Sequence, residues 1–330
     1  MTHVVRFHRT GGPEVLQIED VEIRDPGANE VRVRVEAIGL NRAEAMFRSG
    51  TYLEQPRLPA CLGYEASAIV EKLGPGVSGF ELGDRVSVIP AFSMNDYAVY
   101  AEEAIVPAAA LVARPPGLTA TEGAAVWMAY ITAYGALMDV AKLGKGDHVV
   151  ITAASSSVGT AAIQIANSVG AVTIATTRTR AKKRALEDGG AAHVIVTDEQ
   201  DLLAEVKRIT GGSGARVIFD PVGGPGILAL ADAARPGGIV VLYGALSREP
   251  TPFPLFAAIG KALTLRGYTL FELTTASKRL KGAEEFIKRG LTDGALNPVV
   301  AKVFSFDQIV EAHRYLESNE QLGKIVVTMP

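Results

Sequence analysis

The feature that most constrains the fold is an alternation of short apolar runs and helical patterns that begins near residue 123. Five apolar runs have the length and composition of buried parallel strands, and a sixth stands at 264–268. Because each pair of parallel strands needs a crossover connection, this order predicts a doubly wound α/β sheet. The strand ranges are 148–152, 172–177, 193–197, 217–220 and 239–244, and the helical ranges are 158–169, 180–189, 200–210 and 225–235.

The chain on either side of this alternation is different. Residues 1–122 are rich in Gly and Pro turns and contain a half-buried strand of period two at 31–35. The run Pro115-Pro116-Gly117 marks a domain border. We therefore predict a β-rich domain over 1–122 and an α/β domain over 123–268. The remaining segment offers helices at 275–290 and 306–317 and strands at 299–304 and 324–328.

The composition excludes several classes of protein. With 330 residues, a formal net charge of −3 and a pI of about 6.0, the chain has no basic surface for nucleic acid or anionic membranes. No apolar stretch approaches the roughly 18 residues of a membrane-spanning helix, and the N-terminus lacks the apolar region of a signal peptide. Cys61 is the only cysteine, which rules out a disulfide framework. We expect a cytoplasmic protein that binds neither nucleic acid nor membrane.

The turn after the first strand of the α/β domain has the context of a nucleotide-binding site. The sequence ITAASSSVGTAA, residues 151–162, lies where a strand ends and a helix of small residues begins. A dinucleotide-binding turn normally reads G-x-G-x-x-G, whereas here serines replace the first two glycines. Backbone N–H groups at a helix start bind phosphate whatever the side chain. We predict a nucleotide site formed by Ala154, Ser155, Ser156, Ser157, Val158 and Gly159.

Two further strand ends favour the nucleotide interpretation. The fourth strand ends at Asp220 and is followed by Val222 and Gly223, and the fifth ends at Tyr243 and Gly244. In a doubly wound sheet, ligands bind beyond the carboxyl ends of the strands. We expect Val222, Gly223, Tyr243 and Gly244 to contact the nucleotide. The alternative is a serine-capped strand–helix junction that binds nothing.

Several short motifs resemble one known family. They are GGPEVL at 11–16, GLN at 39–41, RSGTY at 48–52, GDRV at 83–86 and GKIVV at 323–327. Together they resemble the medium-chain dehydrogenase/reductase superfamily, and most closely its zinc-independent quinone oxidoreductases, the zeta-crystallin-like proteins. The resemblance implies a Rossmann NADP-binding domain over 123–268. It also implies a GroES-like catalytic domain over 1–122 that residues 269–330 complete.

The departures from the zinc-dependent relatives concern the metal ligands. Asn41 stands where those relatives have a Cys ligand, and Tyr64 stands where they have the His of a Gly-His-Glu motif. Without these ligands we expect no bound metal. Hydride addition to a conjugated carbon can proceed without a metal, because the negative charge spreads onto an oxygen that hydrogen-bond donors stabilise. The predicted substrate is therefore a quinone or an α,β-unsaturated carbonyl compound.

The resemblance also implies particular site residues. Asn41 matches a position where nicotinamide and substrate meet, Tyr52 a tyrosine that lines the substrate site, and Thr132 a position near the nicotinamide. Tyr64 replaces the metal-binding histidine and offers a phenol to the substrate oxygen. Each has a structural alternative: Asn41 as a turn former, Tyr52 as a packed aromatic ring, and Tyr64 as a filler of the space that a metal would take.

The cofactor choice follows from the end of the second strand. The resemblance places Thr177 where NAD-preferring relatives have Asp or Glu, so the carboxylate that accepts from the ribose is missing. Arg178 follows directly, and Lys182 lies one helical turn further along the chain. An arginine can bind a phosphate through two parallel donors. We predict NADPH, and the alternative is that these basic residues form a solvated helix start.

Two other functions remain open. One is a zinc-free alcohol dehydrogenase or carbonyl reductase, and the other is an NADPH-binding protein with little turnover. The strand predicted at 264–268 would lie at a sheet edge and could pair with its copy, so we expect a homodimer.

Overall fold

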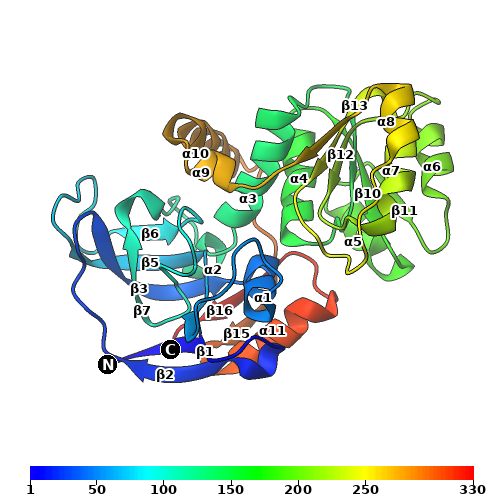
Figure 1. Ribbon diagram of the computed structural model, residues 1–330. Coiled ribbons are helices and arrows are strands. Elements are labelled where there is room, and N and C mark those ends of the chain that lie inside the picture. The colour runs from blue at the N-terminus through cyan, green and yellow to red at the C-terminus, as the bar shows by residue number, and fades with distance from the viewer. The chain divides into compact units, whose positions relative to one another are not determined.

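The computed structural model describes residues 1–330 and divides into two compact units (Figure 1). The first contains residues 1–128 and 298–330, and the second contains residues 129–297. The segment 269–297, which the sequence analysis assigned to the first domain, therefore lies in the second unit. No helix is long and apolar enough to cross a membrane.

The first unit is built on two sheets of mostly antiparallel strands. Its strands are β1 (Thr2–Phe7), β2 (Gln17–Val21), β3 (Glu30–Gly39), β4 (Ala60–Cys61), β5 (Ala66–Leu73), β6 (Arg85–Val88), β7 (Glu103–Pro107), β8 (Leu111–Ala113), β15 (Val300–Ser305) and β16 (Lys324–Thr328). Its helices are α1 (Arg42–Ser49), α2 (Ala120–Gly123) and α11 (Ile309–Ser318). The small sheet has the order β2-β1-β4, and the large one has the order β15-β16-β3-β5-β6-β8 with β7 also paired to β3.

The C-terminal strand β16 connects the two ends of the chain within this unit. It runs antiparallel to β3, with Val326 opposite Gly39, and parallel to β15. Lys324 at the start of β16 therefore lies close to the end of β3. A Cβ on Gly39 would come within 2.0 Å of the Ala124 carbonyl oxygen and 2.7 Å of Lys324 Cε. Only glycine leaves room for this close approach.

Helix α1 begins immediately after β3, at a residue with extended backbone. Asn41 occupies the N-cap position, with φ −134° and ψ 158°, but its side chain does not cap the helix. The helix ends at Gly50, which has the left-handed conformation that terminates many helices. The Asn41 side chain is thus free to take part in the contacts described below.

The second unit contains the predicted α/β sheet. Its strands are β9 (His148–Ile151), β10 (Val172–Thr177), β11 (His193–Val196), β12 (Ala215–Asp220), β13 (Ala234–Leu242) and β14 (Thr264–Gly267). Its helices are α4 (Ser157–Ser168), α5 (Lys183–Asp188), α6 (Leu202–Ile209), α7 (Ile227–Ala233), α8 (Leu255–Lys261), α9 (Phe271–Thr274) and α10 (Ser277–Thr292), and α3 (Trp127–Tyr134) spans the border between the units. The strand order is β11-β10-β9-β12-β13-β14, and all pairs are parallel.

In chain order this sheet reads 3-2-1-4-5-6, which is the Rossmann arrangement. The α/β prediction is confirmed. The order reverses between β9 and β12, so the strand that precedes the serine turn and the strand that ends at Asp220 are neighbours. In open α/β sheets this switch point is where ligands bind.

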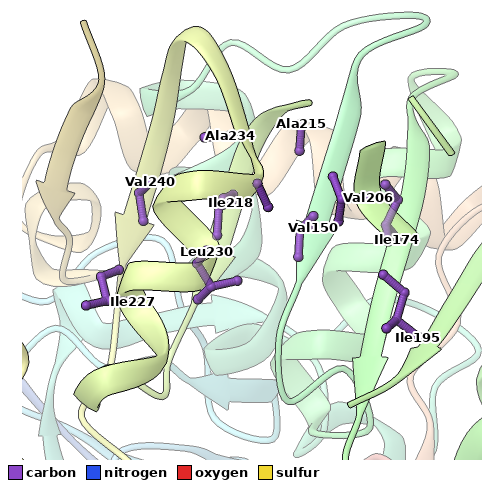
Figure 2. Packing of buried hydrophobic residues seen from close by; sticks show 11 residues of the cluster. Val150, Ile174, Ile195, Val206, Ala215, Ile218, Ile227, Leu230, Ala234 and Val240 are labelled. Atoms are coloured by element: carbon purple, nitrogen blue, oxygen red, sulfur yellow. The ribbon is translucent and has the colours of Figure 1, made fainter. Parts of the chain in front are cut away.

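Branched aliphatic side chains explain why the predicted strands pack as a buried sheet. Figure 2 shows Val150, Ile174, Ile195, Ile218 and Val240, one from each of five strands, in a single cluster. Helices α6 and α7 contribute further apolar residues to it. Helix α8 was not predicted from the sequence. Its apolar residues Phe256 and Ile259 are 89% and 71% exposed, so the buried face on which a periodicity argument depends is missing.

Candidate active site

The serine turn has the geometry of a phosphate-binding helix start. Ser156 is the N-cap of α4, and its side-chain oxygen accepts a hydrogen bond from the Gly159 N–H at 3.0 Å. Ala153 has φ +46°, a conformation that costs roughly 1–2 kcal/mol for a residue other than glycine. A Cβ on Gly159 would lie 2.5 Å from the Ala154 carbonyl oxygen. The helix therefore approaches the strand end closely, as the remaining glycine predicts.

The first turn of α4 leaves backbone donors available. Because the first N–H groups of a helix have no acceptor within it, those of Ser157 and Val158 can bind an anion. Ser156 uses only the N–H of Gly159. Lys182 Nζ donates to Ser155 Oγ at 3.1 Å and brings a positive charge to the same turn. The free N–H groups of Ser157 and Val158 and the positive charge of Lys182 are suited to binding a pyrophosphate.

The ends of β12 and β13 lie beside this turn. The buried Asp220 carboxylate accepts from the Thr152 hydroxyl and from the backbone N–H groups of Val222 at 3.1 Å and Gly223 at 2.8 Å. The Tyr243 ring stacks on Phe219, with the ring centroids 4.0 Å apart. Asp220 thus fixes the loop that follows β12, at the switch point of the sheet.

Tyr243 connects this loop region to the serine turn. Burial raises the pKa of its hydroxyl well above the usual value, the charge of Asp220 adds to the shift, and the nearby Ser156 opposes it. A Cβ on the next residue, Gly244, would lie 2.8 Å from the Pro221 carbonyl oxygen. The structure therefore brings together the predicted residues Ser156, Val222, Gly223, Tyr243 and Gly244 from three segments of the sequence.

The basic residues after β10 differ in their partners. Arg180 forms a two-point contact with Glu199, and Lys183 and Arg184 form ion pairs along α5. Arg178 is exposed, and its side chain forms no hydrogen bond or ion pair. Of this basic run, Arg178 is the arginine whose donors are available to a phosphate. Thr177 Oγ1 donates locally to the Thr179 carbonyl oxygen at 3.2 Å.

The first unit contains a buried polar cluster where β3, α1 and β16 meet. Lys324 Nζ lies 2.5 Å from Glu65 Oε2 and 2.5 Å from Asn41 Oδ1, and both the lysine and the glutamate are almost inaccessible to solvent. Glu65 Oε1 accepts the Met128 N–H at 2.9 Å. Glu44 completes the cluster, because its Oε1 accepts from Asn41 Nδ2 and from the Tyr64 N–H, each at 3.2 Å.

The ammonium group of Lys324 determines how the Asn41 amide is oriented. Because a lysine only donates, the amide oxygen faces Lys324 and the NH₂ group faces away. That group donates to the Gly39 carbonyl oxygen at 3.0 Å and to Glu44. Both amide hydrogens are therefore engaged within the protein, and the donor that the sequence analysis expected Asn41 to offer to a substrate is used elsewhere.

Glu44 is the unusual carboxyl group of this cluster. Burial raises its pKa to about 7, and the positive charge of Lys324 and the hydrogen bond from Asn41 oppose the shift. Its second oxygen, Oε2, is buried and has no hydrogen-bond partner. The Lys324 ammonium group thus lies near two carboxyl groups. When Glu44 is protonated, the only ion pair in the cluster is that of Lys324 with Glu65.

Two tyrosines lie beside the cluster. The Tyr52 and Tyr64 rings are 6.4 Å apart, and Tyr64 is buried while Tyr52 is partly exposed. The Tyr64 hydroxyl donates to Glu54 Oε1 at 3.1 Å. Burial raises the pKa of both hydroxyls, and hydrogen bonding with Tyr64 partly opposes the shift at Tyr52. Both groups are therefore neutral donors at physiological pH.

Comparison with known proteins agrees with this architecture. Residues 27–116 match the family model of the alcohol dehydrogenase GroES-like domain, and residues 157–289 match that of the zinc-binding dehydrogenases. The structure is similar to that of Escherichia coli quinone oxidoreductase complexed with NADPH, with a TM-score of 0.92, 30% identity and 99% of each chain covered. This chain belongs to the quinone oxidoreductase branch of the medium-chain dehydrogenases/reductases.

Two further relatives of this quinone oxidoreductase-type protein have other activities in their names. The structure of an NAD-dependent alcohol dehydrogenase has a TM-score of 0.90, with 33% identity and 100% of each chain covered. The 2-haloacrylate reductase of a Burkholderia species is 29% identical over 329 residues, which are 97% of each chain. The protein is therefore an oxidoreductase, and its relatives indicate a nicotinamide cofactor.

Two residues that the resemblance places in the zinc-ligand motifs of relatives, Asn41 and Glu65, are engaged with Lys324 in this oxidoreductase. The Glu65 carboxylate is held by Lys324 and the Met128 N–H, and the Asn41 oxygen also accepts from Lys324. No group of three or more His, Cys, Asp and Glu side chains in the chain could hold a metal ion. A positively charged ammonium group lies among the oxygens that a metal would need, so this donor set does not fit zinc.

Sequence reasoning missed two important site residues. Lys324 was assigned to a strand and to the motif GKIVV but to no site, although a lysine at the start of a mostly apolar strand is a signal of a buried charge. Glu54 stands in a loop with no periodic pattern, and nothing in the sequence indicates that it contacts Tyr64. Thr132 is buried within α3, and its predicted place near the nicotinamide stays a prediction.

Proposed function

We propose that the protein is an NADPH-dependent reductase of quinones or α,β-unsaturated carbonyl compounds that works without zinc. The observation that carries the proposal is the closed cluster of Lys324, Glu65 and Asn41, which lies at positions that the resemblance matches to the metal-ligand motifs of zinc-dependent relatives. The similarity to a quinone oxidoreductase and to 2-haloacrylate reductase supports the same substrate classes.

The substrate class follows from the donors that remain. Without a Lewis acid, the negative charge of a reduced ketone would develop on one unstabilised oxygen, whereas a quinone or enone spreads it. When bound, NADPH supplies the hydride. We propose that the Tyr52 hydroxyl donates to the substrate oxygen, that Tyr64 supports Tyr52, and that Asn41 lines the site with its amide held by Lys324.

The cofactor would be held mainly by the second unit. We propose that the N–H groups of Ser157 and Val158, with the turn residues Ala154 to Gly159, bind the pyrophosphate. Arg178, with Lys182 beside it, would bind the 2′-phosphate, and Val222, Gly223, Tyr243 and Gly244 would border the ribose and nicotinamide. The lack of an acidic residue at Thr177 favours NADPH over NADH.

The test is steady-state oxidation of NADPH by the purified protein with 9,10-phenanthrenequinone, an enone and a simple ketone as acceptors. We expect turnover with the first two acceptors, no inhibition by a chelator, and no zinc by elemental analysis. Tyr52→Phe should lower kcat more than it lowers affinity for NADPH, because its donor acts on charge that develops in the transition state. Reduction of the ketone with NADH would favour an alcohol dehydrogenase, and tight binding without turnover would favour a nucleotide-binding role.

We also propose that the protein is a homodimer in the cytoplasm. Strand β14 is the edge of the Rossmann sheet, and an edge strand presents unpaired backbone groups to a second copy. The preceding segment exposes Phe253, Phe256 and Ile259. Light scattering after size exclusion should give twice the chain mass, and Phe256→Glu should shift the protein toward monomer. A monomeric wild-type protein at micromolar concentration would contradict the proposal.

A further inference from the structure

Glu54 is the centre of a polar network in the first unit. It stands in a loop between α1 and β4, is half-buried, and accepts four hydrogen bonds. The donors are Tyr64 Oη at 3.1 Å, Ser93 Oγ at 2.5 Å, the Met94 N–H at 3.1 Å and Asn95 Nδ2 at 3.2 Å. A surface glutamate needs no such set of partners, so the arrangement requires an explanation.

The donors determine the resting form of the network. The Met94 N–H and the Asn95 NH₂ group can only donate, and they approach different oxygens of Glu54. This arrangement suits a carboxylate, so the single phenolic hydrogen of Tyr64 points to Glu54. The Tyr64 oxygen then faces Tyr52, and the centroids of the two rings are 6.4 Å apart.

The three groups differ in their access to solvent. Tyr64 is 1% exposed, whereas Tyr52 and Glu54 are both partly exposed. Reduction of a quinone or an enone consumes one proton in addition to a hydride. If Tyr52 gives its proton to the substrate oxygen, it must be reprotonated before the next turnover. The buried Tyr64 cannot take that proton from water directly, but it contacts a carboxylate that can.

We propose that Glu54 supplies this proton through Tyr64, and this proposal rests on the proposed function. The Tyr52 O–H bond breaks as the substrate O–H bond forms. The Tyr64 hydroxyl then turns toward the deprotonated Tyr52 oxygen and gives it the proton, and Glu54, protonated by hydronium or a buffer acid, gives a proton to Tyr64. One proton from solvent enters for each product formed, and all three side chains return to their starting forms. Glu54 acts through Tyr64 and is a positioning residue, whereas Tyr52 contacts the substrate.

The test uses Glu54→Gln and Tyr64→Phe, alone and together, with the quinone as acceptor. Glu54→Gln keeps the shape of the side chain but cannot carry a proton, so kcat should fall roughly tenfold to a hundredfold while the KM for NADPH stays within about twofold. Because the groups act in series, the double variant should be no slower than the slower single variant. Added formate or acetate should restore part of kcat in a Glu54→Ala variant.

The matched control is Tyr97→Phe. Tyr97 belongs to the same loop as Ser93 and Asn95 and donates to Glu30 at 2.9 Å, without contacting Glu54. The Tyr97→Phe variant should retain wild-type kcat. That result would show that loosening of this loop does not cause the loss of kcat in the Glu54 and Tyr64 variants. Wild-type kcat in Glu54→Gln, additive effects in the double variant, or a loss in Glu54→Ala that small acids do not restore would overturn the proposal. A wild-type protein that turns over no quinone or enone would instead overturn the proposed function.

Discussion

The two candidate sites are built in opposite ways. In the second unit, the serine turn presents backbone N–H groups at the start of α4, and its shape is set by the positive φ of Ala153 and the missing Cβ of Gly159. In the first unit, side chains from distant segments meet in a closed cluster, in which Lys324 contacts both Asn41 and Glu65. One site depends on the path of the chain, and the other depends on individual side chains.

Single substitutions should have different effects in the two units. A buried charge loses its hydration, so the cluster is stable only while every charge has a partner. Removal of one partner leaves the other charge unpaired in the low-dielectric interior of the protein. Backbone donors survive any side-chain change that keeps the turn. We therefore expect large and specific effects in the first unit and smaller, graded effects at the turn.

The largest expected effect comes from Lys324→Met. It leaves the fully buried Glu65 carboxylate without its counterion, which should lower the free energy of unfolding by roughly 3–5 kcal/mol. Urea unfolding followed by circular dichroism measures this. The double variant Lys324→Met/Glu65→Gln should recover part of the loss. Lys302→Met, at an exposed lysine of β15, is the control. A loss below about 1 kcal/mol for Lys324→Met would mean that the buried pair contributes little.

The next effect is the pH dependence that Glu44 imposes. Its pKa rises from the ordinary 4.5 to about 7 in the folded protein. The folded state therefore holds the proton more tightly, and stability that is present below pH 4.5 is lost as the pH rises to about 7. Glu44→Gln removes this titrating group. The difference in unfolding free energy between wild type and variant should therefore change by about 3 kcal/mol between pH 4.5 and about 7.

His313 acts in the opposite direction and must be separated from Glu44. Burial, together with the charge of Arg48, lowers its pKa to about 3, so its contribution to stability is lost as the pH falls below about 6.5. Because His313 is present in both proteins, it cancels when Glu44→Gln is compared with wild type at each pH. Parallel curves for the two proteins would show that the pKa of Glu44 is not raised in the folded state.

The third effect concerns the side chains beside the backbone site. Arg178→Ala should lower the affinity for NADPH about tenfold to a hundredfold, because a charged hydrogen bond contributes roughly 1.5–3 kcal/mol to binding. Affinity for NADH should change little. Arg180→Ala is the matched control, since Arg180 is already paired with Glu199. Isothermal titration calorimetry with both cofactors measures this. Equal affinity of the wild type for NADH and NADPH would contradict the role of Arg178.

The same contrast explains what the sequence could predict. The six strands follow from the apolar runs, and ligands of a doubly wound sheet bind beyond the carboxyl ends of its strands. The serine turn and the loops at Asp220 and Tyr243 could therefore be located in advance. Lys324 meets Glu65 and Asn41 only through tertiary folding, because β16 returns beside β3 after nearly the whole chain. Glu54 likewise meets Tyr64 and the loop at 93–95 only in the folded chain. A local pattern cannot encode such a contact. For the same reason the engaged amide of Asn41 was not foreseen.

The smallest expected effect is that of Ser156→Ala, and it tests whether the turn works through its backbone. The Ser156 side chain caps α4 by accepting from the Gly159 N–H at 3.0 Å. Loss of an N-cap of this kind costs about 1 kcal/mol, while glycine at the same position costs only a few tenths. Thermal unfolding should therefore show a modest loss for Ser156→Ala and a smaller one for Ser156→Gly.

Cofactor affinity should follow the same order in these two variants. The N–H groups of Ser157 and Val158 stay in place in both, so NADPH should bind within about fivefold of wild type, which corresponds to roughly 1 kcal/mol. A hundredfold loss in both variants would mean that the Ser156 hydroxyl itself binds the phosphate. The serine turn would then be a side-chain site like the cluster in the first unit, and the contrast between the two units would fail at this residue.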